Sequence, residues 1–194
     1  MEYFDQVAAD YNAASHRWPW SWLRGREAKA LLELSGDVKD ADVLDLGSGS
    51  GYYSSLFLHM GARHVTAVDS SPNMIESLGI DVRIEALNID VEKLDLEKRF
   101  QLIVCAGLLE FVANPRNTLV VARKHANKGS VMVVLVPCDN FWGALYRLFH
   151  SCHGLDISLC RPASFRALAE TTGWIIKEQR RVWPFSCEFG MRAK

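Results

Sequence analysis

A glycine-rich turn directly after a short apolar run is the feature that most constrains this chain. The run is Val43–Leu46, the turn reads Gly47-Ser48-Gly49-Ser50-Gly51, and a helical pattern extends from Tyr52 to about Met60. Glycine permits positive φ and lets another group approach the backbone where a Cβ would block it. Strand, glycine turn and helix in this order are typical of an open α/β sheet, which binds ligands beyond the carboxyl ends of its strands.

The rest of the chain alternates between short apolar strands and helices. Further strands are expected at 64–69, 82–87, 102–105, 131–136, 174–182 and 186–192. Further helices are expected at about 23–34, from Pro72, at 115–126, from after Pro137 to about His150, and at 162–172. Continuous apolar strands indicate a sheet covered on both faces, and strand–helix–strand repetition indicates parallel pairing. The last two strands are joined by a few residues around Pro184, so we predict an antiparallel hairpin that completes a mostly parallel sheet.

Composition excludes several other classes of protein. The chain has 194 residues, 49% of them hydrophobic and 23% charged, with a net charge of −1. Its basic residues are scattered, so no phosphate-neutralising face and no nucleic-acid partner are expected. Five cysteines without framework spacing predict free thiols in a reducing compartment. No signal peptide or apolar run of roughly 20 residues is present, so we expect a cytoplasmic protein without a transmembrane segment.

The spacing of the glycines narrows the choice of ligand. A dinucleotide fingerprint, Gly-x-Gly-x-x-Gly, needs its third glycine at position 52, which is Tyr52. No Gly-Lys-Ser/Thr follows, so a phosphate-binding P-loop is excluded as well. Asp69 ends the next strand, where a carboxylate accepts hydrogen bonds from both hydroxyls of a ribose. These features favour a cofactor with a ribose but no phosphate.

Several motifs, taken in order, extend the pattern along nearly the whole chain. They are Val43–Gly51, Val68–Met74, Asn88–Val91, Phe100–Val104 leading into Leu108–Phe111, and Tyr3-Phe4-Asp5 with Ala8 and Tyr11. In this the chain resembles the class I S-adenosylmethionine-dependent methyltransferases of the small-molecule type. The resemblance implies a Rossmann-like, seven-stranded sheet of order 3-2-1-4-5-7-6 whose last strand is antiparallel, with helices on both faces and an N-terminal helical lid. It also implies one domain over residues 1–194, divided into a helical cap (1–36), a cofactor-binding core (37–137), and substrate-side helices with the C-terminal hairpin (138–194).

The resemblance also implies which residues bind S-adenosylmethionine, whose product is S-adenosylhomocysteine. Asp45, Gly47 and Gly49, in a loop that includes Ser48 and Gly51, would lie along the methionine moiety. Asp69 would hold the ribose. The other implied contacts are Ser70 and Met74 beside the adenine, Asp90 and Val91 at its amino group, the Ala106 carbonyl at the α-amino group, and Tyr11 closing over the cofactor. Two departures are Gln101, where many relatives carry Asp, and Phe111, where many carry His.

Catalytic residues are harder to predict, because methyl transfer from a sulfonium requires only a positioned nucleophile and sometimes a base. His150 and His153 are the only histidines in the substrate-facing region, so either is a candidate general base. Glu110 either faces the substrate or caps a turn. The grouping of these histidines with Cys152 and Cys160 matches no usual zinc pattern, so no metal is expected.

Two aromatic segments keep alternative interpretations. The segment 140–150 has three possible interpretations: an apolar substrate lid, an ordinary helix packed on the sheet, or a membrane-docking element. The third has less support, because Arg147 is the only arginine or lysine of the segment. Trp18, Trp20 and Trp22 either cover the site or join the N-terminal helices to the sheet, and the burial typical of aromatic residues favours the second.

The predicted function is methyl transfer to a small, lipophilic or aromatic metabolite. The sequence does not indicate the oligomeric state. A non-catalytic S-adenosylmethionine-binding regulatory module and a nucleotide-dependent oxidoreductase are the alternatives. The intact loop, Asp69 and Asp90 disfavour the first alternative, and Tyr52 at the third-glycine position disfavours the second.

Overall fold

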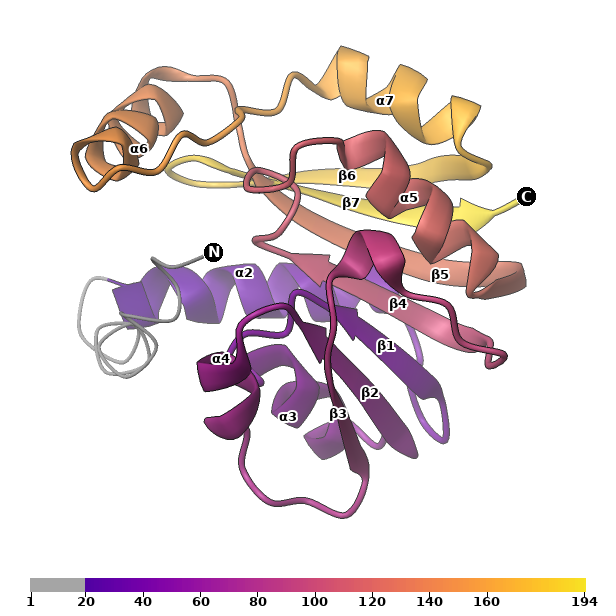
Figure 1. Cartoon of the computed structure of the whole chain (residues 1–194). Helices are drawn as coiled ribbons and strands as arrows, with labels where there is room; N and C mark the ends of the chain where they lie inside the picture. The colour runs from indigo at the N-terminus through magenta and orange to yellow at the C-terminus, as the bar shows by residue number, and fades with distance from the viewer. Residues whose placement is uncertain (1–19) are drawn as a thin grey trace.

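The computed structural model describes residues 20–194, so Tyr11, Trp18 and most of the proposed cap lie outside the described residues. Seven strands form one sheet in the order β3-β2-β1-β4-β5-β7-β6 (Figure 1). The strands are β1 (Asp42–Leu46), β2 (His64–Asp69), β3 (Ile84–Asn88), β4 (Phe100–Ala106), β5 (Ala126–Pro137), β6 (Trp174–Val182) and β7 (Ser186–Ala193). Strands β1 to β5 pair in parallel, whereas β7 is antiparallel to both β5 and β6. The predicted fold class and strand order are therefore confirmed.

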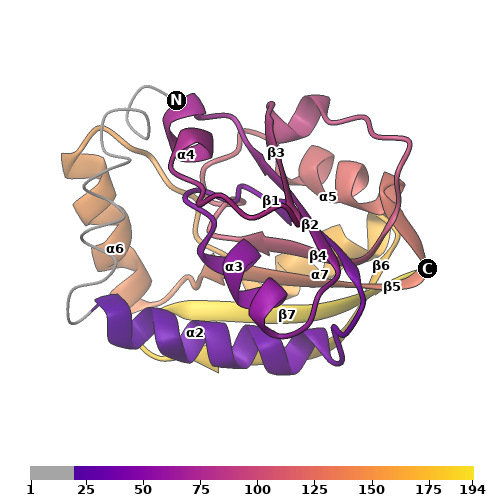
Figure 2. The ribbon, with the colours of Figure 1, turned by 90° about the horizontal axis from the view of Figure 1, so that it is seen from below.

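Helices cover both faces of this sheet. The helices of the described residues are α2 (Trp20–Ser35), α3 (Tyr52–His59), α4 (Pro72–Glu76), α5 (Pro115–Lys124), α6 (Phe141–Cys152) and α7 (Pro162–Thr171), with a 3₁₀ turn, η1, at Val91–Lys93. Helices α2 and α3 lie on one face, and α5 and α7 lie on the other (Figures 1 and 2). Helix α6 lies beyond the carboxyl ends of the parallel strands rather than over either face. Among residues 20–194, no helix combines the length and apolarity that a membrane span requires.

Two apolar clusters hold the layers together. Phe100, Trp174 and Phe189 belong to the cluster on the α5 and α7 side, while Leu31 and Phe57 belong to the cluster on the α2 and α3 side. All five side chains are fully buried. Burying a side chain of this size contributes about 1.5–3 kcal/mol each. The sheet is thereby fixed on both faces, and its carboxyl edge is a rigid support for the loops that follow the strands.

The prediction that all five cysteines are free thiols is wrong. Cys138, just after β5, forms a disulfide with Cys187 on β7, with their Cα atoms 5.5 Å apart. The pairing arises because β7 runs antiparallel beside β5, with Val136 opposite Cys187. The cysteines left as thiols among the described residues are Cys105, Cys152 and Cys160.

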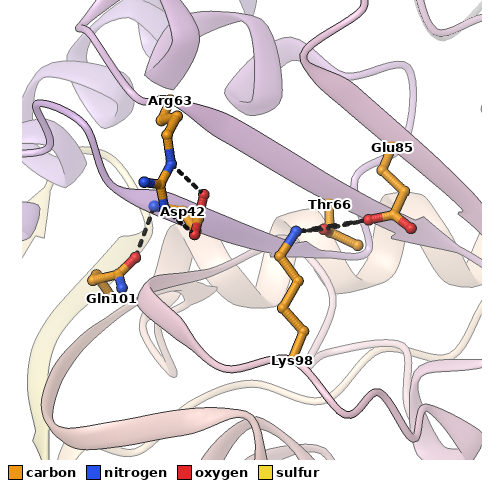
Figure 3. Close-up of polar contacts among 6 residues, drawn as sticks. All are labelled: Asp42, Arg63, Thr66, Glu85, Lys98 and Gln101. Atoms are coloured by element: carbon orange, nitrogen blue, oxygen red, sulfur yellow. Dashed lines mark hydrogen bonds and ion pairs between the residues drawn. The ribbon is translucent and has the colours of Figure 1, made fainter.

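A polar network at the amino ends of the strands accounts for one of the two departures from the family pattern. The Gln101 side-chain carbonyl accepts a hydrogen bond from the Asp42 amide at 2.8 Å (Figure 3). The Asp42 carboxylate is paired with Arg63, which lowers its pKa below the usual value. An aspartate at position 101 would place a second carboxylate beside Asp42, and the neutral amide avoids that repulsion.

A second set of polar contacts, separate from that of Asp42, Arg63 and Gln101, joins the side chains of Lys98, Glu85 and Thr66. Lys98 lies 3.8 Å from the Glu85 carboxylate and 3.4 Å from the Thr66 hydroxyl, which itself donates to Glu85 (Figure 3). All three side chains join β2 and β3 to the segment before β4. These contacts support the edge of the sheet opposite to the glycine loop.

Candidate functional site

The glycine loop after β1 requires glycine for two physical reasons. Gly47, Gly49 and Gly51 all have positive φ, at 71°, 53° and 81°. A Cβ on Gly47 would lie 2.9 Å from the Leu108 Cβ, closer than real Cβ atoms approach. The Gly47 amide donates to the Val68 carbonyl at 2.8 Å, and the Ser48 amide donates to the same oxygen at 3.0 Å. The loop is thus fastened to the end of β2.

Asp69 lies at the end of β2 and links the glycine loop to the next loop. One carboxylate oxygen accepts from the Gly49 amide and the other from the Ser71 amide, both at 2.9 Å. A carboxylate has about four acceptor positions, so two remain for a ligand. The two amides fix the orientation of the carboxylate at the end of β2.

Asp45 lies beneath the loop and carries a perturbed carboxyl group. It is 2% exposed and accepts a hydrogen bond from the Ser54 hydroxyl at 2.7 Å. Burial, and to a smaller extent the Asp69 carboxylate, raises the pKa of Asp45 to about 6. The buried Ser48 hydroxyl has no hydrogen-bond partner in the structure. A ligand with a cationic group and a polar group fits this pair, because it would stabilise the ionised carboxylate and satisfy the hydroxyl.

The loops after β2, β3 and β4 supply the other predicted residues. Met74 on α4 is 3% exposed, and its sulfur lies 4.0 Å from the position of a Cβ on Gly49. Asp90 is half-buried and accepts a hydrogen bond from the Glu92 amide at 3.0 Å. Asp90 is thereby the N-cap of η1, whose first residue is the buried Val91. Ser70 is exposed and lies just before Ser71, the N-cap of α4. Ala106 is the last residue of β4. All of these residues lie at or just after the carboxyl ends of the strands.

Glu110 is a buried carboxyl just beyond β4. It is 5% exposed, and one of its carboxylate oxygens has no hydrogen-bond partner in the structure. The other oxygen lies 3.8 Å from the position of a Cβ on Gly107. Burial, reinforced by the Glu27 carboxyl, raises the pKa of Glu110 to about 8. At neutral pH this group is therefore mostly protonated.

Two further carboxyl groups with raised pKa values, the half-buried Glu27 and the buried Glu188, were not singled out from the sequence. Burial raises the pKa of Glu27 on α2 to about 7, against a hydrogen bond from the Ser186 hydroxyl. Burial and the Glu27 carboxyl raise the pKa of Glu188 on β7 to about 8, and neither Glu188 oxygen has a hydrogen-bond partner in the described part of the chain. Glu27 falls on the apolar stripe of α2 with Leu23 and Leu31, and that position was the available sign of its burial. Glu188 gave no such sign, because its burial depends on α2 covering β7.

The two candidate histidines lie in different environments. His150 is 7% exposed and packs among aromatic rings, with centroids 4.4 Å from Tyr146 and 5.9 Å from Phe111. Neither ring nitrogen has a hydrogen-bond partner among the described residues, and burial lowers the pKa of His150 below its usual value. His153 is exposed, with Nδ1 2.8 Å from the Phe149 carbonyl. The fold therefore brings His150 to Phe111, the position where many relatives carry an imidazole, and leaves His153 at the surface.

Fold and site together define a class of protein. A doubly covered α/β sheet of this order, with a Gly-x-Gly-x-Gly loop after β1 and acids after β2 and β3, is a class I methyltransferase domain. Residues 20–179 match the family model described as a methyltransferase domain, and the chain belongs to that family. This membership confirms the resemblance found in the sequence, and with it S-adenosylmethionine as the cofactor of the class.

Relatives and structural neighbours agree on the class but differ in substrate. The chain is 27% identical over 140 residues to the ubiquinone biosynthesis O-methyltransferase of Pseudoalteromonas translucida, covering 63% of this chain and 58% of that protein. It is 27% identical over 191 residues to the tRNA U34 carboxymethyltransferase of Shewanella baltica, covering 82% of this chain and 56% of that one. The chain thus spans little more than half the length of these curated relatives.

A solved structure supports the fold over almost the whole chain. In a Haloferax volcanii complex between the Trm112 methyltransferase activator and a methyltransferase, one chain superposes with a TM-score of 0.83 at 18% identity. The match covers 98% of this chain and 97% of that chain.

Proposed function

We propose that this chain transfers a methyl group from S-adenosylmethionine to a small, lipophilic or aromatic metabolite. The observation that carries the proposal is the hydrogen-bonded group formed by the glycine loop, the buried Asp45 and Asp69, which accepts from two backbone amides. Asp69 would accept the ribose hydroxyls. Asp45 and the loop Gly47–Gly51 would lie along the methionine moiety.

The remaining cofactor contacts follow from the loops at the same edge. Ser70 and Met74 would flank the adenine, while Asp90 would accept from its amino group and the Val91 amide would lie beside it. The Ala106 carbonyl would accept from the α-amino group. When bound, S-adenosylmethionine supplies a methyl group on a positively charged sulfur, which is a strong electrophile.

This chain's own residues would then position the acceptor atom, exclude water and remove a proton. His150 suits the last role, because its lowered pKa keeps the imidazole neutral near pH 7 and neither ring nitrogen has a hydrogen-bond partner within residues 20–194. The surrounding rings of Tyr146, Phe149 and Phe111 suit an apolar or aromatic acceptor. His153 is less suited, since its Nδ1 contacts a backbone carbonyl at the surface.

The test is product formation from labelled cofactor. We expect S-adenosylhomocysteine when the protein is incubated with labelled S-adenosylmethionine and a lipophilic metabolite extract, but not with bulk tRNA. Asp69→Ala should weaken S-adenosylhomocysteine binding by about 1–3 kcal/mol, the usual loss when buried hydroxyls lose a charged partner. His150→Gln should lower turnover without that loss of binding, and His153→Gln is the matched control.

Two outcomes would contradict the proposal. Cofactor binding without turnover on any extract would indicate a regulatory module instead. Turnover confined to the tRNA fraction would assign the site to a nucleic-acid substrate.

A further inference from the structure

Exposed aromatic and aliphatic side chains from three elements meet at one end of the molecule. We call this group the aromatic surface; it consists of Trp22 on α2, Phe141, Trp142, Leu145, Leu148 and Phe149 on α6, and Trp183 in the β6–β7 turn. Every member is at least 45% exposed, with Phe141 at 72% and Leu148 at 60%. The Trp183 ring lies 6.2 Å from Trp22 and 6.0 Å from Trp142. Ring contacts therefore connect the three elements into one surface.

Helix α6 is the main part of this surface, and it does not pack like a core helix. Its buried residues are Gly143 and His150 only. Phe141, Leu145 and Leu148 recur at the spacing of one helix face, and they point that face to solvent. The interpretation of this segment as an ordinary helix packed on the sheet is therefore wrong. Trp20 and Trp22 are 42% and 46% exposed, so they are only partly buried. Trp22 contacts Trp183 in the β6–β7 turn, as expected of a residue that joins α2 to the sheet, and Trp18 lies outside the described residues.

The charges around the aromatic surface are basic. The stretch Phe141–Leu155 contains no aspartate or glutamate and includes Arg147. On α2, the Arg26 guanidinium lies over the Trp22 ring at 4.9 Å, and the half-buried Glu27 directly follows Arg26. Asp139, just before α6, is paired with Arg161 at 2.6 Å. Among the described residues, the aromatic surface is therefore left uncovered, and its nearest unpaired charges are the basic side chains of Arg26 and Arg147, the latter in a pocket with Asp139 and Arg161.

We propose that the aromatic surface binds the headgroup region of an anionic lipid bilayer. Tryptophan and phenylalanine insert at the boundary between headgroups and acyl chains, and arginine pairs with lipid phosphates. A second copy of this chain fits the surface less well, because a two-fold contact would place these basic side chains against each other. The structure adds what the sequence lacked: Arg147 alone gave weak support for a membrane, whereas α2 adds Arg26 and Trp22, and the hairpin adds Trp183.

The aromatic surface lies near the predicted cofactor site. Helix α6 lies beyond the carboxyl edge of the sheet, the same edge at which the glycine loop lies (Figures 1 and 2). A bilayer on this surface would bring that edge close to the lipid, where an amphiphilic acceptor would be concentrated. The lipid contact itself does not require methyl transfer, so it is tested separately from the proposed function.

The experiment is co-sedimentation of the full chain with vesicles. We compare vesicles of phosphatidylcholine with vesicles that contain about one quarter phosphatidylglycerol. We expect binding to the anionic vesicles that weakens at high salt, because salt screens the arginines. Phe141→Ser combined with Leu148→Ser should weaken binding by about tenfold or more, since it removes two inserting apolar side chains. The control is Ile80→Ser combined with Val82→Ser, which alters two exposed apolar residues in the α4–β3 loop, outside the surface.

Three results would overturn the proposal. The first is the absence of sedimentation with anionic vesicles, and the second is equal loss of binding in the surface and control variants. The third is a concentration-dependent dimer that disappears in the surface variant, because it would assign the surface to a second copy. Matching thermal unfolding of both variants and the parent protein shows that the comparison involves folded proteins.

Discussion

Replacing Glu110 with glutamine should change how the stability of the protein depends on pH. The buried carboxyl has a pKa of about 8 in the folded protein, against 4.5 for an unperturbed glutamate. The folded state therefore holds a proton that the unfolded chain releases. Stability from this group is fully present below pH 4.5 and is lost as the pH rises toward 8.

The size of the effect follows from the two pKa values. Each pH unit between them lowers the free energy of unfolding by about 1.4 kcal/mol, so the loss reaches roughly 3 kcal/mol at pH 7. Glutamine does not ionise, so its contribution to the free energy of unfolding does not change with pH. It also leaves an amide buried without a partner, at a pH-independent cost of about 1–3 kcal/mol. The change of stability with pH is thus a better measure of the Glu110 pKa than the stability at any one pH, because the cost of the buried amide is the same at every pH.

The assay is urea unfolding of the parent protein, Glu110→Gln and the surface control Glu97→Gln at intervals between pH 5 and pH 8. The parent protein and Glu97→Gln should lose stability in parallel, whereas the curve for Glu110→Gln should be flatter. Parallel curves for all three proteins would refute the assignment of a raised pKa to Glu110. Glu27 and Glu188 titrate in the same range, so a residual slope in Glu110→Gln is expected.

Two other substitutions test the supports of the site. Gly47→Ala should destabilise the protein by about 2–3 kcal/mol and weaken S-adenosylhomocysteine binding, because positive φ and the Leu108 Cβ both oppose a side chain. Urea unfolding and calorimetry measure the two effects, and unchanged values in both would contradict the loop geometry. Cys187→Ser should cost about 4 kcal/mol, the loop-closure value for a bridge with a sequence separation of 49. A reductant should lower the stability of the parent protein to the same level and leave the variant unchanged, and insensitivity of the parent protein would argue against the bridge.

Local patterns were enough to predict the strands, the glycine loop and the order of the acids. Val43–Leu46 is followed directly by the turn, and Asp69 ends the next strand, so each is visible within a few residues. The disulfide was missed because Cys138 and Cys187 meet only through the pairing of β5 with β7. The aromatic surface was missed for the same reason, since its tryptophans come from three elements. The features that the sequence did not predict are therefore contacts between distant segments, whereas the local conformation was predicted.

Phe111 shows why such contacts matter for the chemistry. Taken by itself, a phenylalanine at a position where many relatives carry histidine removes an imidazole from the site. Helix α6 places His150 with its ring centroid 5.9 Å from Phe111, so an imidazole is present there after all, from a different element. This imidazole depends on the position of α6, whose first turn is capped by the Asn140 side chain, which accepts from the Gly143 amide at 2.7 Å. The backbone at Gly143 lies so close to Cys138 that a Cβ there would be 2.0 Å from the Cys138 carbonyl oxygen. A side chain at position 143 should therefore displace α6 and affect the candidate base and the aromatic surface together.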